Sequence, residues 1–109
     1  MAFNEELAGR VRRALKNRRN LQERKMFGGL AFLLRGNMCC GVVGDELMVR
    51  VGASSYEKAL AARHVRPMDF TGKPLKGFVY VMPPGIASDR ALKTWVTKGA
   101  KCALSLPAK

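Results

Sequence analysis

Hydrophobic and polar positions near the amino terminus follow the period of an amphipathic helix. Asn4 is a residue type that caps helices, and Glu5 and Glu6 in the first turn suit the positive end of the helix dipole. We therefore expect a helix that begins after Asn4 and buries one apolar stripe. The stripe consists of Phe3, Leu7, Val11, Ala14 and Leu15.

Three short apolar runs come next and predict a β-meander. They are Leu30–Leu34, Met38–Val43 and Glu46–Val51, separated by Gly36-Asn37 and Gly44-Asp45. Glycine followed by Asn or Asp suits the two-residue II′ turn of a hairpin. We expect three consecutive antiparallel strands.

The following segment predicts a short helix and a short extended piece. Ser54 and Glu57 have the spacing of a capping box, which indicates a helix that runs to Arg63. Pro67 disfavours its continuation. The extended piece is expected over Met68–Phe70.

The last third predicts a strand and a long helix. Phe78–Met82 is rich in β-branched and aromatic residues and is followed by Pro83-Pro84-Gly85. Ser88 and Asp89 then open an amphipathic helix. Its apolar positions are Leu92, Trp95, Val96, Gly99, Ala100 and Ala103. The predicted order is α-β-β-β-α-β-β-α, an α+β fold with an antiparallel sheet and flanking helices.

Length and composition favour one folded domain over residues 1–109, because 48% of the 109 residues are hydrophobic. The amino terminus lacks the apolar core of a signal peptide. The apolar run Leu30–Leu34 is far too short to span a bilayer. We expect a cytoplasmic protein without a membrane partner.

The charge is strongly positive: 20 Lys and Arg oppose 8 Asp and Glu, which gives +12. Eight of the basic residues fall between Arg10 and Lys25. Such a cluster can bind nucleic-acid phosphates regardless of base sequence, or can simply be a solvated helix face that maintains solubility. The candidate phosphate contacts are Arg10, Arg12, Arg13, Lys16, Arg18 and Arg19.

The loop Thr71–Gly77 is a second candidate contact surface. Thr71, Lys73 and Lys76 stand near glycine amides that could hold an anion, with Arg50 and Arg66 as expected neighbours. The alternative is a rigid connection whose glycines and Pro74 set the backbone angles.

Cysteine and histidine usage argues against a metal centre or an enzyme. Cys39 and Cys40 are adjacent on a predicted strand, so we expect their side chains on opposite faces. With Cys102 they have no zinc-like spacing and suit reduced thiols. His64 is the sole histidine, and no catalytic pair or triad accompanies it. We expect no catalytic residue, metal or cofactor.

Several blocks in a fixed order resemble the amino-terminal domain of the TfoX/Sxy competence-regulator family. The blocks are Met26–Phe32, Gly36–Gly41, Leu47–Gly52, Arg66–Gly77 and the Leu92-x-x-Trp95 step of the last helix. The resemblance implies an α+β fold like the secretion-chaperone-like and YgaC-like arrangement, which agrees with the predicted element order.

The resemblance also implies a function. Full-length members of that family are bacterial cytoplasmic proteins that activate competence genes alongside a separate DNA-binding activator, and the family supplies no catalytic residues. Full-length members carry a second, helical carboxy-terminal domain, whereas this sequence ends at Lys109.

Two functional interpretations follow. The first is a non-enzymatic regulatory domain that binds protein, nucleic acid or both. The second is a protein-interaction or structural module, expected to be a homodimer. It rests on strands that are apolar on both faces, since Leu30, Phe32 and Leu34 alternate with Ala31 and Leu33. One face of such a sheet needs cover from another element or from a partner.

Overall fold

The computed structural model describes residues 3–26, 28–68 and 76–107. In chain order the elements are α1 (Glu5–Leu15), β1 (Leu21–Met26), β2 (Gly29–Leu34), β3 (Asn37–Val43), β4 (Glu46–Arg50), η1 (Ala53–Ser55), α2 (Tyr56–Leu60), β5 (Val65–Pro67), β6 (Phe78–Val81), η2 (Pro83–Ile86) and α3 (Asp89–Leu104).

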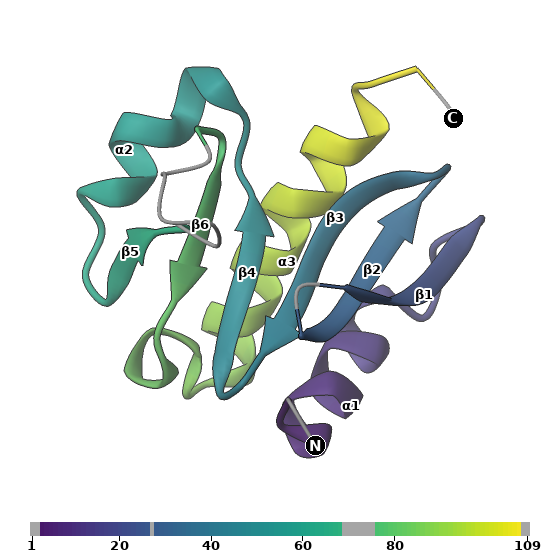
Figure 1. Cartoon of the computed structure of the whole chain (residues 1–109), viewed down its shortest axis with the longest axis horizontal. Coiled ribbons are helices and arrows are strands. Elements are labelled where there is room, and N and C mark those ends of the chain that lie inside the picture. The colour runs from purple at the N-terminus through teal and green to yellow at the C-terminus, as the bar shows by residue number, and fades with distance from the viewer. Residues whose placement is uncertain (1–2, 27, 69–75, 108–109) are drawn as a thin grey trace.

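The strands form one six-stranded antiparallel sheet in the order β1-β2-β3-β4-β6-β5. Helices α1 and α3 lie behind this sheet, while α2 lies at its β5–β6 end (Figure 1). The main core fills the space between the sheet and the two long helices. The predicted α+β class and the predicted order of helices and strands are confirmed, with one additional strand.

Both long helices begin where the sequence predicts. The side-chain oxygen of Asn4 accepts from the Leu7 amide at 3.0 Å, and the Ser88 hydroxyl accepts from the Ala91 amide at 3.1 Å. Phe3 lies outside α1 and bridges to Gly44, but it still packs against the main core.

The additional strand is β1, in a segment that the sequence analysis treated as a continuation of the basic run. It pairs with β2 along its whole length, from Leu21 opposite Leu34 to Met26 opposite Gly29. Only its two end residues are half-buried and the four between them are exposed. The apolar alternation that predicts a strand is therefore missing from this edge.

The first predicted hairpin turn is shifted by one residue. Leu34 pairs with Asn37, so the central residues are Arg35 and Gly36, with φ of 55° and 82°. Positive φ at both positions is the pattern of a type I′ turn. At the second turn Gly44 has a φ of 58°, and of the two central residues only this first one has a positive φ, as a II′ turn requires.

The segment after the meander differs most from expectation. The capping box predicted from Ser54 does not form, because Ser54 lies inside the 3-10 turn η1 and α2 starts only at Tyr56. The strand β5 covers Val65–Pro67, immediately before the predicted extended piece over Met68–Phe70. Met68 is fully buried against Met48 and Tyr80 on the far side of the sheet, and residues 69 and 70 lie outside the described residues.

The prediction that Cys39 and Cys40 face opposite sides of their strand is wrong. Phe32 pairs with Cys40 and Leu33 with Met38, so Cys39 is the extra residue of a β-bulge. Both thiols are completely buried in the main core, with their Sγ atoms 3.8 Å apart.

Helix α3 approaches β3 very closely at Gly99. A Cβ atom on Gly99 would lie 2.4 Å from the carbonyl oxygen of Cys39. A residue with a side chain would clash at this position, so glycine allows α3 to pack this closely against the sheet.

Candidate nucleic-acid interface

Arg10, the first of the sequence-predicted contacts, is used inside the protein. Its guanidinium donates to the Asp89 carboxylate at 3.1 Å and to the Ile86 carbonyl at 2.8 Å, and only 18% of its side chain is exposed. It therefore joins α1 to the start of α3 and is poorly placed to reach a phosphate.

Arg12 is engaged as well. It donates from Nε and Nη2 to both carboxylate oxygens of Glu23 on β1, at 2.8 and 2.9 Å. This hydrogen-bonded pairing lowers the pKa of Glu23 and raises that of Arg12. The pair neutralises one of the positive charges that the sequence assigns to the first helix.

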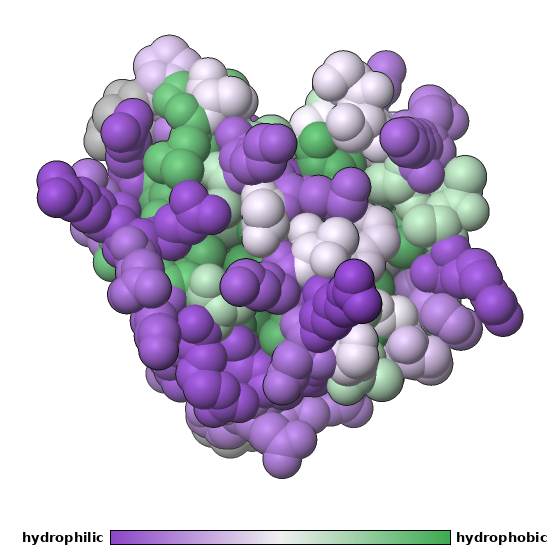
Figure 2. Space-filling view, turned by 180° about the vertical axis from the view of Figure 1, so that it is seen from behind, coloured by the Kyte–Doolittle hydropathy of each residue, from purple (hydrophilic) through white to green (hydrophobic). Residues whose placement is uncertain are grey.

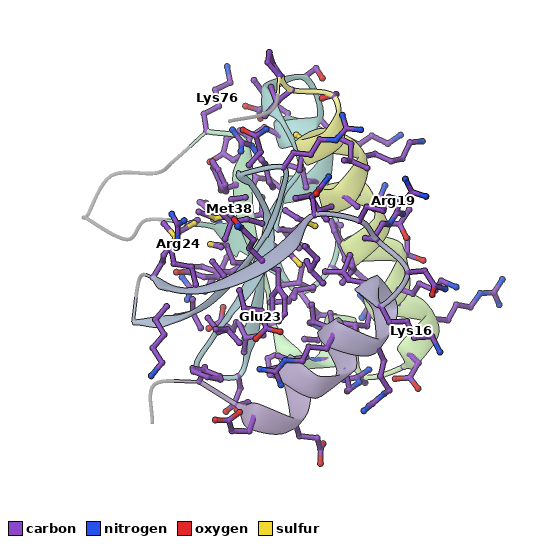
Figure 3. The ribbon with its side chains drawn as sticks, turned by 90° about the vertical axis from the view of Figure 1, so that its right-hand side faces the viewer. Lys16, Arg19, Glu23, Arg24, Met38 and Lys76 are labelled. Atoms are coloured by element: carbon purple, nitrogen blue, oxygen red, sulfur yellow. The ribbon has the colours of Figure 1, made fainter. Side chains whose placement is uncertain are left out.

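The other four predicted contacts are exposed. Arg13 lies in the last turn of α1 and Lys16 caps its carboxy-terminal end, and Arg18 and Arg19 lie in the turn before β1. Within the part of the chain that the structure describes, none of these four forms an ion pair. Lys16 and Arg19 lie on the helical side of the molecule, whereas Arg24 lies on the opposite side of the sheet (Figure 3).

Helix α3 contributes further exposed cations, which sequence analysis missed. They occupy the side of the helix away from its apolar stripe, so a helical projection of the sequence contains the signal. These residues are Arg90, Lys93, Lys98 and Lys101.

Two shallow depressions that share Lys93 are lined by cations of the two helices. One, about 270 Å³, lies between α1 and α3 and is lined by Arg13, Lys16 and Lys93 among others. The other, about 420 Å³, follows α3 and also includes Lys93. Hydrophilic residues cover much of this side in Figure 2. We define the basic helical face as Arg13 of α1, Lys16 at its carboxy-terminal cap, and Arg90, Lys93, Lys98 and Lys101 of α3.

The second predicted contact surface is only partly described. Thr71 and Lys73 lie outside the described residues, while Lys76 is exposed and far from Lys16 (Figure 3). Arg50 and Arg66, the expected neighbours of this loop, interact with side chains of the sheet. Arg50 lies over the Phe78 ring, and Arg66 stacks on Tyr80 and donates to both Glu46 oxygens at 2.9 and 3.1 Å.

Across residues 3–26, 28–68 and 76–107, no three His, Cys, Asp or Glu side chains gather as metal ligands. The helices in these same ranges lack the length and apolar character needed to cross a bilayer.

Comparison with known proteins identifies the family. Searches of curated proteins and of solved structures return no significant match. The family model of the TfoX N-terminal domain matches residues 13–103, which include the carboxy-terminal end of α1, all of the sheet and nearly all of α3. The match covers far more than half of the chain, and the chain therefore belongs to the TfoX N-terminal domain family.

Proposed function

We propose that this chain is a non-enzymatic regulatory domain that binds nucleic-acid backbone through the basic helical face. The supporting observation is that six cations from two helices share one surface without an ion pair among the described residues. Lysine and arginine side chains displace condensed counterions from phosphates, which favours binding without base recognition. In this role the domain contributes to transcriptional regulation, including that of competence genes, by holding a complex on nucleic acid.

Fluorescence anisotropy with a labelled 20-base-pair duplex tests the proposal, with a second series on single-stranded RNA. We expect binding at low ionic strength that weakens steeply and log-linearly as salt rises. Absence of salt-dependent binding to either probe contradicts the proposal.

A matched set of variants identifies the surface. The double variant Lys16→Gln/Lys93→Gln removes two charges from the basic helical face, and Arg24→Gln/Lys76→Gln removes two charges from elsewhere. We expect only the first pair to reduce the salt slope, by about 2, because each lost phosphate contact contributes about 0.9. Equal effects of the two pairs would mean that net charge alone attracts the probe.

A second candidate function is supported by the other face of the sheet. Among the described elements the long helices cover one face of the sheet, and the other face holds a smaller apolar cluster of Met48, Met68 and Tyr80 (Figure 1). Met38, Val43 and Phe78 surround this cluster and are only partly buried. We propose that this face packs against a second copy of the chain. Analytical ultracentrifugation is expected to show a dimer that Val43→Asp dissociates, and a strictly monomeric parent protein contradicts this.

A further inference from the structure

A second groove, which shares Lys98 and Lys101 with the basic helical face, lies between α2 and the carboxy-terminal half of α3. It has a volume of about 680 Å³, within the range of small-molecule binding sites. The molecule is visibly hollowed between two lobes at the top of Figure 2. The walls of the groove include Ala59 of α2, Ala62 just after α2, Trp95 and Cys102 of α3, and Leu106 just after α3. An apolar body of moderate size therefore has surface to pack against.

The charges around this groove are of one sign. Lys58 of α2 and Lys98 and Lys101 of α3 line it, and no Asp or Glu is among its described lining residues. The Lys98 ammonium lies 5.9 Å from the centre of the Trp95 ring. Ser54 and Ser55 add hydroxyl donors at the α2 side. Three cations beside an apolar wall complement a ligand that combines a negative head with an apolar body.

We propose that this groove binds a small organic anion, a carboxylate or phosphate monoester with an aliphatic or aromatic body. The lysines attract and hold the anionic head, and the alanine, leucine and tryptophan side chains bury the body. The inference goes beyond nucleic-acid binding, which provides no occupant for the apolar wall. Lys58 belongs to the groove but not to the basic helical face, so the two proposals can fail independently.

The groove contains its own spectroscopic reporter, because Trp95 is the sole tryptophan of the chain. Octanoate, octyl phosphate and the neutral analogue octanamide are titrated while Trp95 fluorescence is followed. We expect saturable changes with both anions and about tenfold weaker binding of octanamide, because charge-assisted hydrogen bonds are lost. The tighter of the two anions identifies the head group. Equal binding of octanamide and octanoate, or no saturable signal with either anion, overturns the proposal.

Variants and a chemical probe locate the ligand. Lys58→Gln is expected to weaken octanoate binding several-fold, and Ala62→Leu to abolish it by filling the groove. The matched control Lys25→Gln, on β1 at the other end of the sheet, is expected to bind as the parent does. Octanoate should also protect Cys102, the one cysteine that is not fully buried, from iodoacetamide. Unchanged Cys102 reactivity at saturation, or equal loss of binding in Lys58→Gln and Lys25→Gln, contradicts the assignment.

Discussion

Arg12 of α1 and Glu23 of β1 form a two-pronged ion pair that connects the first helix to the edge strand of the sheet. Both side chains are partly exposed, so the pair adds modest stability. The geometry of this ion pair nevertheless has two structural consequences. It removes Arg12 from the cations available to a ligand, and it holds β1 against the helical layer.

The first prediction concerns acid stability. The pKa of Glu23 is lowered from its ordinary value of 4.5 by the hydrogen bonds from Arg12. A lowered carboxylate pKa stabilises the fold at neutral pH, and this stabilisation is lost as pH falls below 4.5 through the folded-state pKa. Glu23→Gln is expected to cost roughly 0.5–1 kcal/mol at pH 7 and less at pH 2.5.

Urea denaturation across this pH range measures the difference. Glu57→Gln is the matched control, because Glu57 is exposed and forms no ion pair within the described residues. A Glu23→Gln cost that is the same at both pH values would contradict the prediction.

The second prediction compares the glycines of the two long helices. Gly99→Ala places a methyl group against the Cys39 carbonyl and is expected to destabilise the protein by about 1–3 kcal/mol. Gly9→Ala on α1 meets only the end of the Arg13 side chain, at 3.7 Å, and is expected to stabilise by roughly 0.5–1 kcal/mol. Urea titrations should give changes in the free energy of unfolding, relative to the parent protein, that have opposite signs for the two variants. If both variants were more stable than the parent, the close approach of α3 to β3 at Gly99 would be refuted.

The third prediction concerns the turn between β2 and β3. Arg35 has a φ of 55°, a conformation that costs most L residues about 1 kcal/mol but that asparagine tolerates. Arg35→Asn is expected to raise the melting temperature by several degrees. Arg35→Ala removes the same charge without this tolerance and should give no increase, so equal gains from both variants would assign the effect to charge.

The fourth prediction concerns thiol reactivity. Cys39 and Cys40 are completely buried, and the pKa of Cys40 is raised well above its ordinary value by its hydrogen bond with Cys39 and by burial. The nucleophilic thiolate of Cys40 is therefore scarce at neutral pH, and burial shields both thiols from a reagent. Mass spectrometry after iodoacetamide treatment is expected to show one modification, at Cys102, in the native protein and three in urea. Native labelling of Cys39 or Cys40 would show that this part of the core opens readily.

Local chemistry predicts a large part of this fold. Asn4 and Ser88 cap their helices as expected, because N-cap preference depends only on neighbouring backbone amides. The β-bulge at Cys39 could not be predicted, since it depends on the register between β2 and β3. Strand β1 was missed for a related reason: its pairing with β2 and the contact of Arg12 with Glu23 supply the stabilisation that its own residues lack.

The sequence predicts that an exposed basic surface exists, but it does not predict which residues form that surface. Clustering along the chain correctly locates Arg13 and Lys16 on an exposed surface. It includes Arg10 and Arg12 because a linear pattern does not show that Asp89 and Glu23 lie within reach. It omits Lys93, which the packing of α1 beside α3 brings to the same depression.

The charged sequence of β1 has a consequence for how copies of the protein can meet. An unpaired strand at the border of a sheet invites another chain to add to it, and charged side chains discourage such growth. Glu23, Arg24 and Lys25 stand along one border, and the opposite border is a three-residue strand that ends in Pro67. Both borders of the sheet thus disfavour strand addition and fibril-like growth, and the second copy proposed above would have to pack on a broad face of the sheet.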